Sequence, residues 1–351
     1  MKTGEAFLPL HDGVAPSWLL EKMKRLASLL VEAIIELYGT EELLRRLSDP
    51  FWFQSFGCLL GFDWHSSGLT TTTCAAIKEG LQGKEKALGF FAAGGKGQRA
   101  LKTPEEIVCW ASLVGVDGDS IVLASRLSAK VDNVALQDGY SLYQHMIFFN
   151  SKGNWTVIQQ GMNLDLMYAR RYHWLSLDLK DFVNEPHSGI ASPIKHDKVL
   201  NLVASESAGN REATLEVVKD AGLREIKRLF LSRDNPILSF CDMDPKRFLK
   251  KLEELKWLEP GDFKELLLVK GLGAKTLRAL SLTAELLTGK SPSYRDPVRY
   301  AYAHGGKDGY PFPVDRETYS KTIDMLEKIV RRAELSLVEK EKLFRKLSLI
   351  F

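Results

Sequence analysis

The sequence has few cysteines, and they are far apart. Among 351 residues the four cysteines are Cys58, Cys74, Cys109 and Cys241, and no Cys-x-x-Cys pair occurs. This spacing disfavours a zinc knuckle, an iron–sulfur cluster and a disulfide framework. Buried, reduced thiols in a cytosolic protein are the simpler interpretation. Because no histidine spacing typical of metal ligands appears either, we expect no metal and no cofactor.

Long hydrophobic runs are also missing. The N-terminal stretch MKTGEAFLPLHDGVAPSW has no continuous apolar segment. The longest apolar helical stretch, at 19–37, is interrupted by charged residues that include Glu21, Lys24 and Glu32. This pattern disfavours both secretion and membrane spanning. A cytoplasmic protein with no membrane partner is therefore expected.

The chain carries no large excess of charge of either sign. Its formal net charge is +3, with 26% charged and 45% apolar residues, which is ordinary for a globular protein. Any nucleic-acid site must therefore come from local clustering of cations. The length suffices for two or three domains, each with its own core.

Short β-prone runs dominate the middle of the chain. They lie at 87–94, 120–125, 145–150, 154–161 and 168–177. The segment 145–161 predicts a hairpin, because Ser151-Lys152-Gly153 joins two apolar runs. A helix is expected at 103–115, with Thr103 as its N-cap and Glu106 completing a capping box.

From about residue 196 onward the pattern becomes helical. Helices are expected near 197–206, 210–220, 222–231, 245–257, 262–270, 274–288, 316–333 and 337–349. Proline, glycine and serine cluster at 185–196, which indicates a boundary. We therefore predict an α+β protein with a mixed α/β domain at 1–190 and an all-helical domain at 191–351.

The most informative stretch is 262–288, DFKELLLVKGLGAKTLRALSLTAELLT. Its central Gly271-Leu272-Gly273 permits a tight hairpin between two helices, with no Cβ in the path of an approaching phosphate. Free backbone N–H groups at the start of the second helix face the hairpin mouth. This resembles a helix–hairpin–helix element, which contacts nucleic-acid backbone without reading bases. The expected DNA contacts here are Lys270, Gly271, Gly273, Thr276 and Arg278. The alternative is an ordinary glycine-linked helix pair in a core.

Two further motifs extend this resemblance. Lys275 follows the hairpin, and Pro313-Val314-Asp315 precedes an expected helix. Together they resemble the helix–hairpin–helix DNA glycosylase superfamily, which carries G-h-G-x-K at the hairpin and P-V-D at the next helix start. The resemblance covers residues 200–351 at most and implies removal of damaged bases, with Lys275 as nucleophile and Asp315 as the catalytic aspartate. The two residues are farther apart here than in that family, which makes 289–312 an insertion.

Both residues suit the implied chemistry. A neutral lysine amine attacks C1′ of a flipped nucleotide and forms a Schiff base after the base departs. A carboxylate near the sugar stabilises an oxocarbenium-like transition state and assists proton transfer. Each residue also has a simpler interpretation, with Lys275 as a phosphate contact and Asp315 as a helix N-cap.

The segment 291–315, SPSYRDPVRYAYAHGGKDGYPFPVD, interleaves basic and aromatic residues. Its expected phosphate contacts are Arg295, Arg299 and Lys307. Its tyrosines are of the type that stacks on unpaired bases. The alternative is a surface loop held by tyrosine packing.

The N-terminal half contains a possible second site. The turn Gly94-Gly95-Lys96-Gly97-Gln98-Arg99 follows an apolar strand and offers backbone N–H groups to a phosphate, although it lacks Walker A spacing. Polar side chains on otherwise apolar strands need partners when buried, and they often mark a site. The residues of this possible site are His65, Lys96, Arg99, His145, Gln160, Arg171 and His173. Satisfied core histidines and surface arginines are the alternative interpretation.

The whole chain also resembles a prokaryotic family catalogued as domain of unknown function 763. The stretches that carry this resemblance are TGEAFLPLHDGVAPSWL, RLSDPFWFQSFGCLLGFDWHSSGLTTTT, the GGKG turn, QQGMN, ARRYHWLS and AHGGKDGYPFPVD. The resemblance spans nearly the full length, and it implies no particular function.

Three functions therefore stay open. The preferred one is DNA repair by a lysine-dependent DNA glycosylase with AP-lyase activity. The second is a structure-specific DNA nuclease, with its chemistry in the N-terminal domain and the hairpin for binding. The third is a nucleic-acid-binding protein without catalysis.

Overall fold

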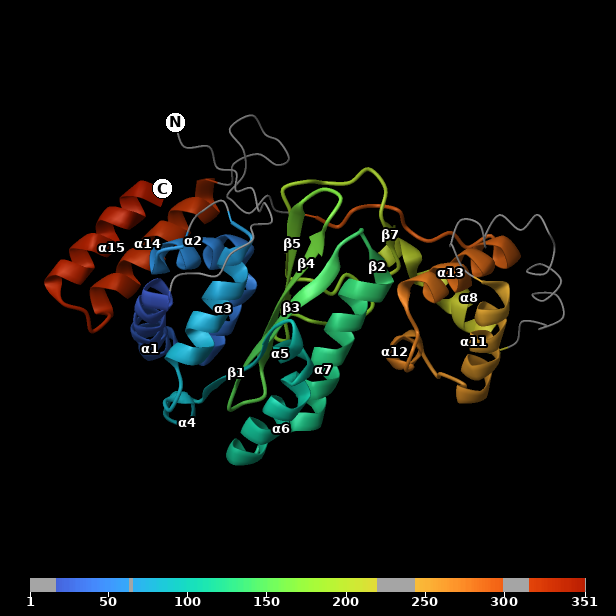
Figure 1. The fold of residues 1–351 in the computed structure, drawn as a ribbon, viewed down its shortest axis with the longest axis horizontal. Helices are drawn as coiled ribbons and strands as arrows, with labels where there is room; N and C mark the ends of the chain where they lie inside the picture. Colours follow the sequence, from blue (N-terminus) through green and yellow to red (C-terminus); the bar gives the residue numbers. More distant parts are fainter. Residues whose placement is uncertain (1–16, 63–65, 220–243, 299–315, 351) are drawn as a thin grey trace.

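The computed structural model describes residues 17–62, 66–219, 244–298 and 316–350 (Figure 1). Helices surround a five-stranded antiparallel sheet, which confirms the predicted α+β class. None of the described helices combines the length and the apolar character that crossing a membrane requires.

The elements up to β3 are mainly helices. They are α1 (Ser17–Ser48), α2 (Pro50–Leu60), α3 (Gly68–Gly80), α4 (Glu85–Leu88), β1 (Phe90–Lys96), α5 (Gln98–Leu101), α6 (Thr103–Val114), α7 (Gly118–Lys130), the π-helix η1 (Val131–Ala135), β2 (Leu136–Gln137) and β3 (Ser141–Asn150). Strands then give way to helices. The rest are β4 (Trp155–Asn163), β5 (Tyr168–Leu175), β6 (Gly189–Ala191), β7 (Leu200–Asn201), the 3-10 helix η2 (Ser205–Ser207), α8 (Ala208–Lys219), α11 (Pro245–Leu258), α12 (Phe263–Leu268), α13 (Ala274–Thr288), α14 (Arg316–Arg332) and α15 (Leu337–Ile350).

The main sheet has the strand order β1-β3-β4-β5-β6, and β2 pairs with β7 in a separate ribbon. The predicted hairpin at 145–161 is confirmed as β3 and β4, which are joined by a turn at Ser151–Gly153. Its register pairs Gln144 with Gln160 and His145 with Gln159, as the alternation of side chains predicted.

The central strands are buried on both faces, and their side chains alternate between two cores. We call the first the α7 core; its strand members include Phe91, Phe149, Val157 and Trp174, packed against α6, α7 and α13. The second, the α1 core, takes the neighbouring strand residues Phe90, Phe148, Ile158 and Leu175 and packs them against α1, α2 and α3. Burial of both faces explains why these strands are apolar along their whole length.

The last two helices, α14 and α15, pack in the α1 core. Apolar residues of α14 and α15 lie there beside those of α1 and α2: Met325, Leu326, Ile329, Val330, Leu343 and Leu347. Figure 1 shows α14 and α15 beside α1 and α2, whereas α8, α11, α12 and α13 lie on the other side of the sheet. Both cores therefore draw side chains from both sides of residue 190, and the division into 1–190 and 191–351 stays a prediction.

Two predictions of secondary structure were wrong. The run 120–125, expected as a strand, lies in α7, because Asp117 caps this helix at the Ser120 N–H (3.1 Å) and the buried Ile121 and Ala124 have helical spacing. The helix expected at 197–206 is replaced by β7 and η2, because the N–H groups of Val199 and Asn201 donate to the backbone at 293–294. The helix expected at 222–231 lies outside the described residues.

Helix α6 confirms the helix predicted at 103–115, but its N-terminus is built differently. Thr103 is the first helical residue, and its hydroxyl donates to the Ala100 carbonyl at 2.7 Å. The Glu106 carboxylate accepts instead from the Gly94 N–H (2.7 Å) and from Lys78 Nζ (2.6 Å). The predicted capping box is therefore absent, because β1 and α3 supply stronger partners for Glu106.

The packing of α14 generates a stability prediction. Leu326→Ala should lower the free energy of unfolding by about 2–5 kcal/mol, because a fully buried leucine leaves a cavity in the α1 core. Leu337→Ala, on the neighbouring helix at a position 83% exposed, is the matched control and should change it by less than about 0.5 kcal/mol. Denaturant titrations measure both values. Equal, small effects would contradict the return of α14 to this core.

Candidate functional site

The hairpin between α12 and α13 has the geometry expected from its glycines. Gly271 has φ of +78°, a conformation that favours glycine, and Leu272 is 2% exposed in the α7 core. Gly273 is the N-cap of α13 in an extended conformation, and it supplies no side-chain hydrogen bond. The first N–H groups of α13 therefore point out of a helix end that no side chain caps. Leu272 is buried in the same core as Leu266 and Leu267 of α12 and Leu277 of α13.

Lysines from two other elements hold the hairpin, and the sequence did not reveal them. Lys130, at the end of α7, donates from Nζ to the Leu272 carbonyl at 2.9 Å. Lys251, on α11, donates to the Lys270 carbonyl at 2.7 Å. Burial and the neighbouring Lys251 ammonium lower the pKa of Lys130. Positive charge is therefore concentrated around the hairpin carbonyls, together with the exposed Lys270 and Lys275.

Gln137 links the hairpin to β2, one strand of the two-stranded ribbon. Its Nε2 donates to the Ala274 carbonyl at 2.9 Å, and its Oε1 accepts from Arg278 Nε at 2.6 Å. Arg278 therefore braces α13 against β2 as well as adding charge near the mouth. Thr276 lies on the same first turn and is partly exposed.

The pairing of Lys275 with Asp315 stays a prediction. Asp315 lies outside the described residues, as do Arg299 and Lys307. The helix that follows, α14, packs in the α1 core, whereas α13 packs in the α7 core. Figure 1 shows the two helices at opposite ends of the long axis. Arg295 is exposed and pairs with Glu206 at 2.8 Å.

The glycine-rich turn after β1 uses its backbone within the fold. The Gly94 N–H donates to Glu106, and the Gly97 N–H donates to the Tyr143 carbonyl at 2.8 Å. Lys96 lies over the Tyr143 ring, and Arg99 pairs with Glu79 at 3.3 Å. Two of the amides expected to hold a phosphate are thus engaged elsewhere. Arg99 and Glu79 line a groove of about 540 Å³ that also contains Lys78, Glu106 and Trp110.

His145 belongs to a buried polar chain that crosses the α7 core. Its Nδ1–H donates to Gln159 Oε1 at 2.9 Å, so its Nε2 accepts from the Ser125 hydroxyl at 2.8 Å. Gln159 continues the chain by donating to Asp132 Oδ2 at 2.5 Å. Asp132, in the π-helix, also accepts from Trp174 Nε1 and from His187 Nε2. Neither His145 nor Ser125 reaches the surface, which favours a structural role.

Arg171 and His173 form a second buried network, on the α1 side. The Arg171 guanidinium donates from Nε to His173 Nε2 at 2.9 Å and lies 4.7 Å over the Phe53 ring. Its other nitrogens donate to Gln54, Thr70 and the Pro50 carbonyl. His173 Nδ1 in turn contacts the Leu47 carbonyl at 2.9 Å. These contacts fasten β5 to α1, α2 and α3.

Gln160 has the same kind of role beside them. Its Nε2 donates to the Ser67 carbonyl at 2.9 Å and also contacts the Tyr143 hydroxyl. The contacts tie β4 to the start of α3. His65 lies outside the described residues. Among the predicted second-site residues that the structure describes, Arg171 therefore contacts His173 and is also the cross-strand partner of Gln160, whereas Lys96 ends β1 and Arg99 lies in α5.

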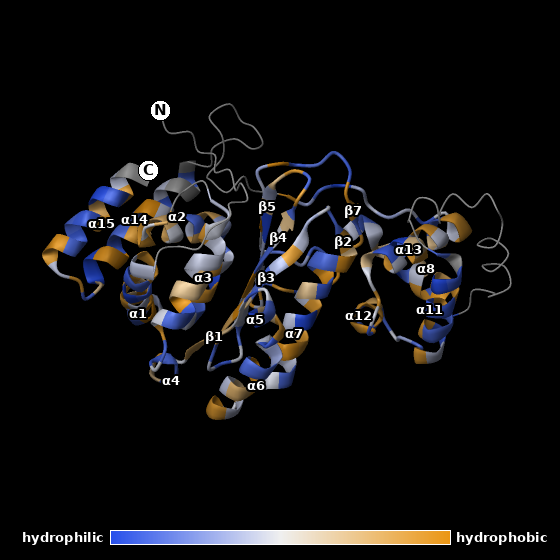
Figure 2. Ribbon diagram, in the orientation of Figure 1, coloured by the Kyte–Doolittle hydropathy of each residue, from blue (hydrophilic) through white to orange (hydrophobic). Residues whose placement is uncertain are grey.

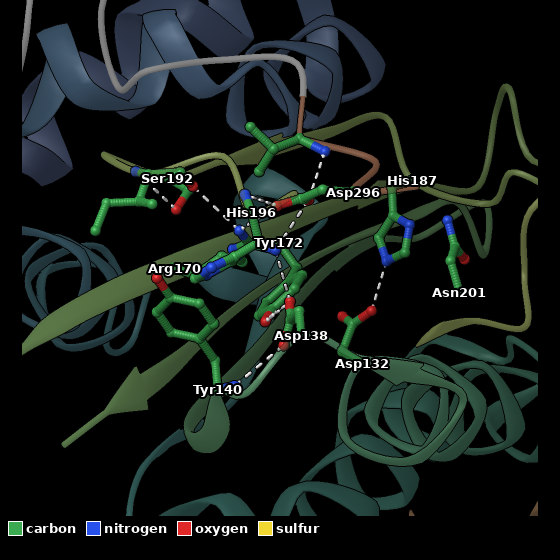
Figure 3. Close-up of polar contacts among 12 residues, drawn as sticks. Asp132, Asp138, Tyr140, Arg170, Tyr172, His187, Ser192, His196, Asn201 and Asp296 are labelled. Atoms are coloured by element: carbon green, nitrogen blue, oxygen red, sulfur yellow. Dashed lines mark hydrogen bonds and ion pairs between the residues drawn. The ribbon is translucent and has the colours of Figure 1, made fainter. Parts of the chain in front are cut away.

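A third cluster, centred on Arg170, was not predicted (Figure 3). The guanidinium pairs with Asp138 at 2.9 Å and with Asp296 at 2.8 Å, and all three side chains are fully buried. Tyr172 donates to Asp138 at 2.7 Å, and the His196 N–H donates to Asp296 at 2.8 Å. Burial raises the pKa of Asp138 despite the arginine beside it. This cluster fixes the segment around Asp296 to β5.

Within the described part of the chain, no three His, Cys, Asp or Glu side chains are arranged to hold a metal ion. The carboxylates of the Arg170 cluster accept from a guanidinium, a hydroxyl and backbone N–H groups instead. These carboxylates therefore hold segments of the fold together, whereas the hairpin carries four lysines, Lys130, Lys251, Lys270 and Lys275, of which the last two are exposed.

The fold and this site define an α+β protein whose sheet region supports a glycine hairpin between two helices. A protein-family model described as "Protein of unknown function (DUF763)" matches residues 4–314, and the chain belongs to this family. Comparison with curated proteins and comparison with solved structures each gave no match.

The buried histidines generate a prediction for pH. Burial lowers the pKa of His145, and burial together with Arg171 holds the pKa of His173 well below its ordinary value. Histidine in the unfolded chain has a pKa of about 6.5. Below that pH these two histidines therefore bind protons in the unfolded chain but stay neutral in the folded one. The free energy of unfolding should therefore fall as pH drops below about 6.5, by up to about 1.4 kcal/mol per pH unit for each histidine.

Urea titrations between neutral pH and mildly acidic pH measure this dependence. His145→Gln keeps an acceptor for Ser125, and the variant should show a flatter decline than the parent protein. A parent protein whose stability is unchanged over this interval would contradict the neutral, buried state of both histidines.

Proposed function

We propose that this protein binds the phosphate backbone of DNA at the hairpin between α12 and α13, independently of base sequence. The main support is that Lys130, Lys251 and Lys270 all lie at one glycine hairpin. This hairpin adjoins a helix N-terminus that no side chain caps. Like charges held this close favour an anion between them, and oriented N–H groups give that anion its hydrogen bonds.

The two glycines support the proposal in different ways. Gly271 needs its positive φ for the turn itself, and an added Cβ would lie 3.3 Å from Lys251 Nζ. Gly273 has φ of −115°, and an added Cβ would have no atom within 4 Å. The fold therefore does not require glycine at position 273. Close approach of a phosphate to the backbone at this position would require glycine, because any side chain would stand in its path.

A narrower proposal adds catalysis. Lys275 is exposed on the first turn of α13, beside the hairpin mouth where a phosphate would lie. A nucleotide held there by its phosphate and flipped from the duplex would bring its sugar towards the lysine amine. The amine would attack C1′ and displace the damaged base, and opening of the sugar ring would then give a Schiff base that permits strand cleavage. This is the lysine-dependent glycosylase and AP-lyase activity.

Gly273→Ala gives the sharpest test of backbone binding. The variant should keep the stability of the parent protein, because the methyl group enters open space, while its affinity for DNA falls for unrelated sequences alike. Gel-shift titrations with two duplexes of different sequence measure the affinity, and thermal melts check the fold. A folded variant that binds both duplexes like the parent would make the hairpin a core element only.

Lys270→Ala tests the charge of the same site. Loss of one phosphate contact should lower the slope of log affinity against log salt concentration by about 0.9. Lys152→Ala, an exposed lysine at the β3–β4 turn that pairs with Glu41, is the matched control and should leave the slope unchanged. Equal slopes for all three proteins would contradict a phosphate contact at Lys270.

Borohydride trapping on abasic DNA tests the catalytic proposal separately. The parent protein and Lys270→Ala should form a covalent adduct, and Lys275→Ala should form none. An adduct that persists in Lys275→Ala would exclude this lysine as the nucleophile. Metal-dependent strand cleavage that survives Lys275→Ala would support the nuclease alternative instead.

A further inference from the structure

Helix α11 has an unusual distribution of charge. Four cations occupy its first seven residues, Lys246, Arg247, Lys250 and Lys251, and its first turn holds no acidic residue. The acidic residues follow later, at Glu253 and Glu254. Cations near a helix N-terminus oppose the helix dipole, so this order lowers the stability of the helix. An external anion along the first two turns would compensate for it.

Three of these cations, Lys246, Arg247 and Lys250, are exposed, whereas the Lys251 side chain is only 14% exposed. Phe248, Leu249, Leu252 and Leu255 are buried in the α7 core, whereas Arg247 and Lys250 are exposed. The visible side of α11 is largely hydrophilic in Figure 2. In the described part of the chain Lys251 pairs with Glu254 at 3.0 Å, while Arg247 and Lys250 enter no ion pair.

Lys251 joins this basic face to the hairpin. Its Nζ contacts the Lys270 carbonyl and lies 3.3 Å from where a Cβ of Gly271 would be. Arg247 lies one helical turn before Lys251, so their side chains are neighbours on one face about 6 Å apart along the axis. Cations are therefore present from the hairpin, where Lys251 contacts the Lys270 backbone, to the first turn of α11. We call this group the α11 strip: Arg247, Lys250, Lys251 and Lys270.

We propose that the α11 strip holds a stretch of double-stranded DNA backbone that continues from the hairpin, so that α11 is a second phosphate-contact element. The proposal rests on the proposed function and extends it to a substrate class. Charge complementarity favours phosphate, because duplex DNA presents one negative charge per about 1.7 Å of its axis. The strip also holds no aromatic side chain, whereas proteins that grip single strands interleave cations with stacking aromatics. The exposed Trp257 of α11 lies at the opposite end of the helix, beyond the acidic residues.

The double variant Arg247→Ala/Lys250→Ala tests the strip. For duplex DNA, the slope of log affinity against log salt should fall by about 1.8, the sum of two phosphate contacts. Lys256→Ala, an exposed lysine on the same helix but beyond the acidic residues, is the matched control and should leave affinity and slope unchanged. Thermal melts of the double variant should equal or exceed those of the parent, because the removed charges oppose the helix dipole.

The outcomes separate this inference from the proposed function. If Gly273→Ala weakens binding while the double variant binds with the parent's affinity and slope, the hairpin binds DNA and the strip does not. If neither variant changes binding, both proposals fail. If the double variant weakens binding of single-stranded DNA or RNA but not of duplex DNA, the duplex assignment is overturned.

Discussion

Burial of β3, β4 and β5 on both faces governs the rest of the structure. Strands that are covered by helices on each side give their polar side chains little access to water, so most such groups need an internal partner. His145, Arg170, Arg171 and His173 do so through networks that reach α1, α2, α7 and the π-helix. These networks fix the helices around the sheet and with them the platform, at α7, η1 and β2, on which the hairpin rests.

The same constraint gives the polar residues on these apolar strands internal partners that their sequence pattern does not identify. The sequence showed that Arg171 and His173 need partners, but their partners lie on α1 and α2, more than a hundred positions earlier in the chain. The Arg170 cluster joins this arginine to Asp138, 32 positions away, and to Asp296, 126 positions away. No local pattern encodes such pairings, because they depend on how the helices pack.

Local patterns succeeded where the chain itself determines the structure. The β3–β4 register follows from the alternation of side chains around a short turn, and the hairpin at Gly271 follows from two glycines between helical runs. They failed at 120–125 and 197–206, where helix capping by Asp117 and backbone pairing with 293–294 decide the outcome. The cations around the hairpin were predicted in part. Lys270 and Lys275 are close to its glycines in the sequence, whereas Lys130 and Lys251 belong to the distant helices α7 and α11.

We infer that DNA phosphate lies against the backbone of this hairpin. Amide chemical shifts, followed by NMR while duplex DNA is added to the isotope-labelled protein, test it most directly. We expect the largest changes at the amides of Gly271, Gly273, Lys275 and Thr276, with smaller ones along the first turns of α11. Changes confined to other surfaces, with these hairpin amides unperturbed at saturation, would contradict the claim.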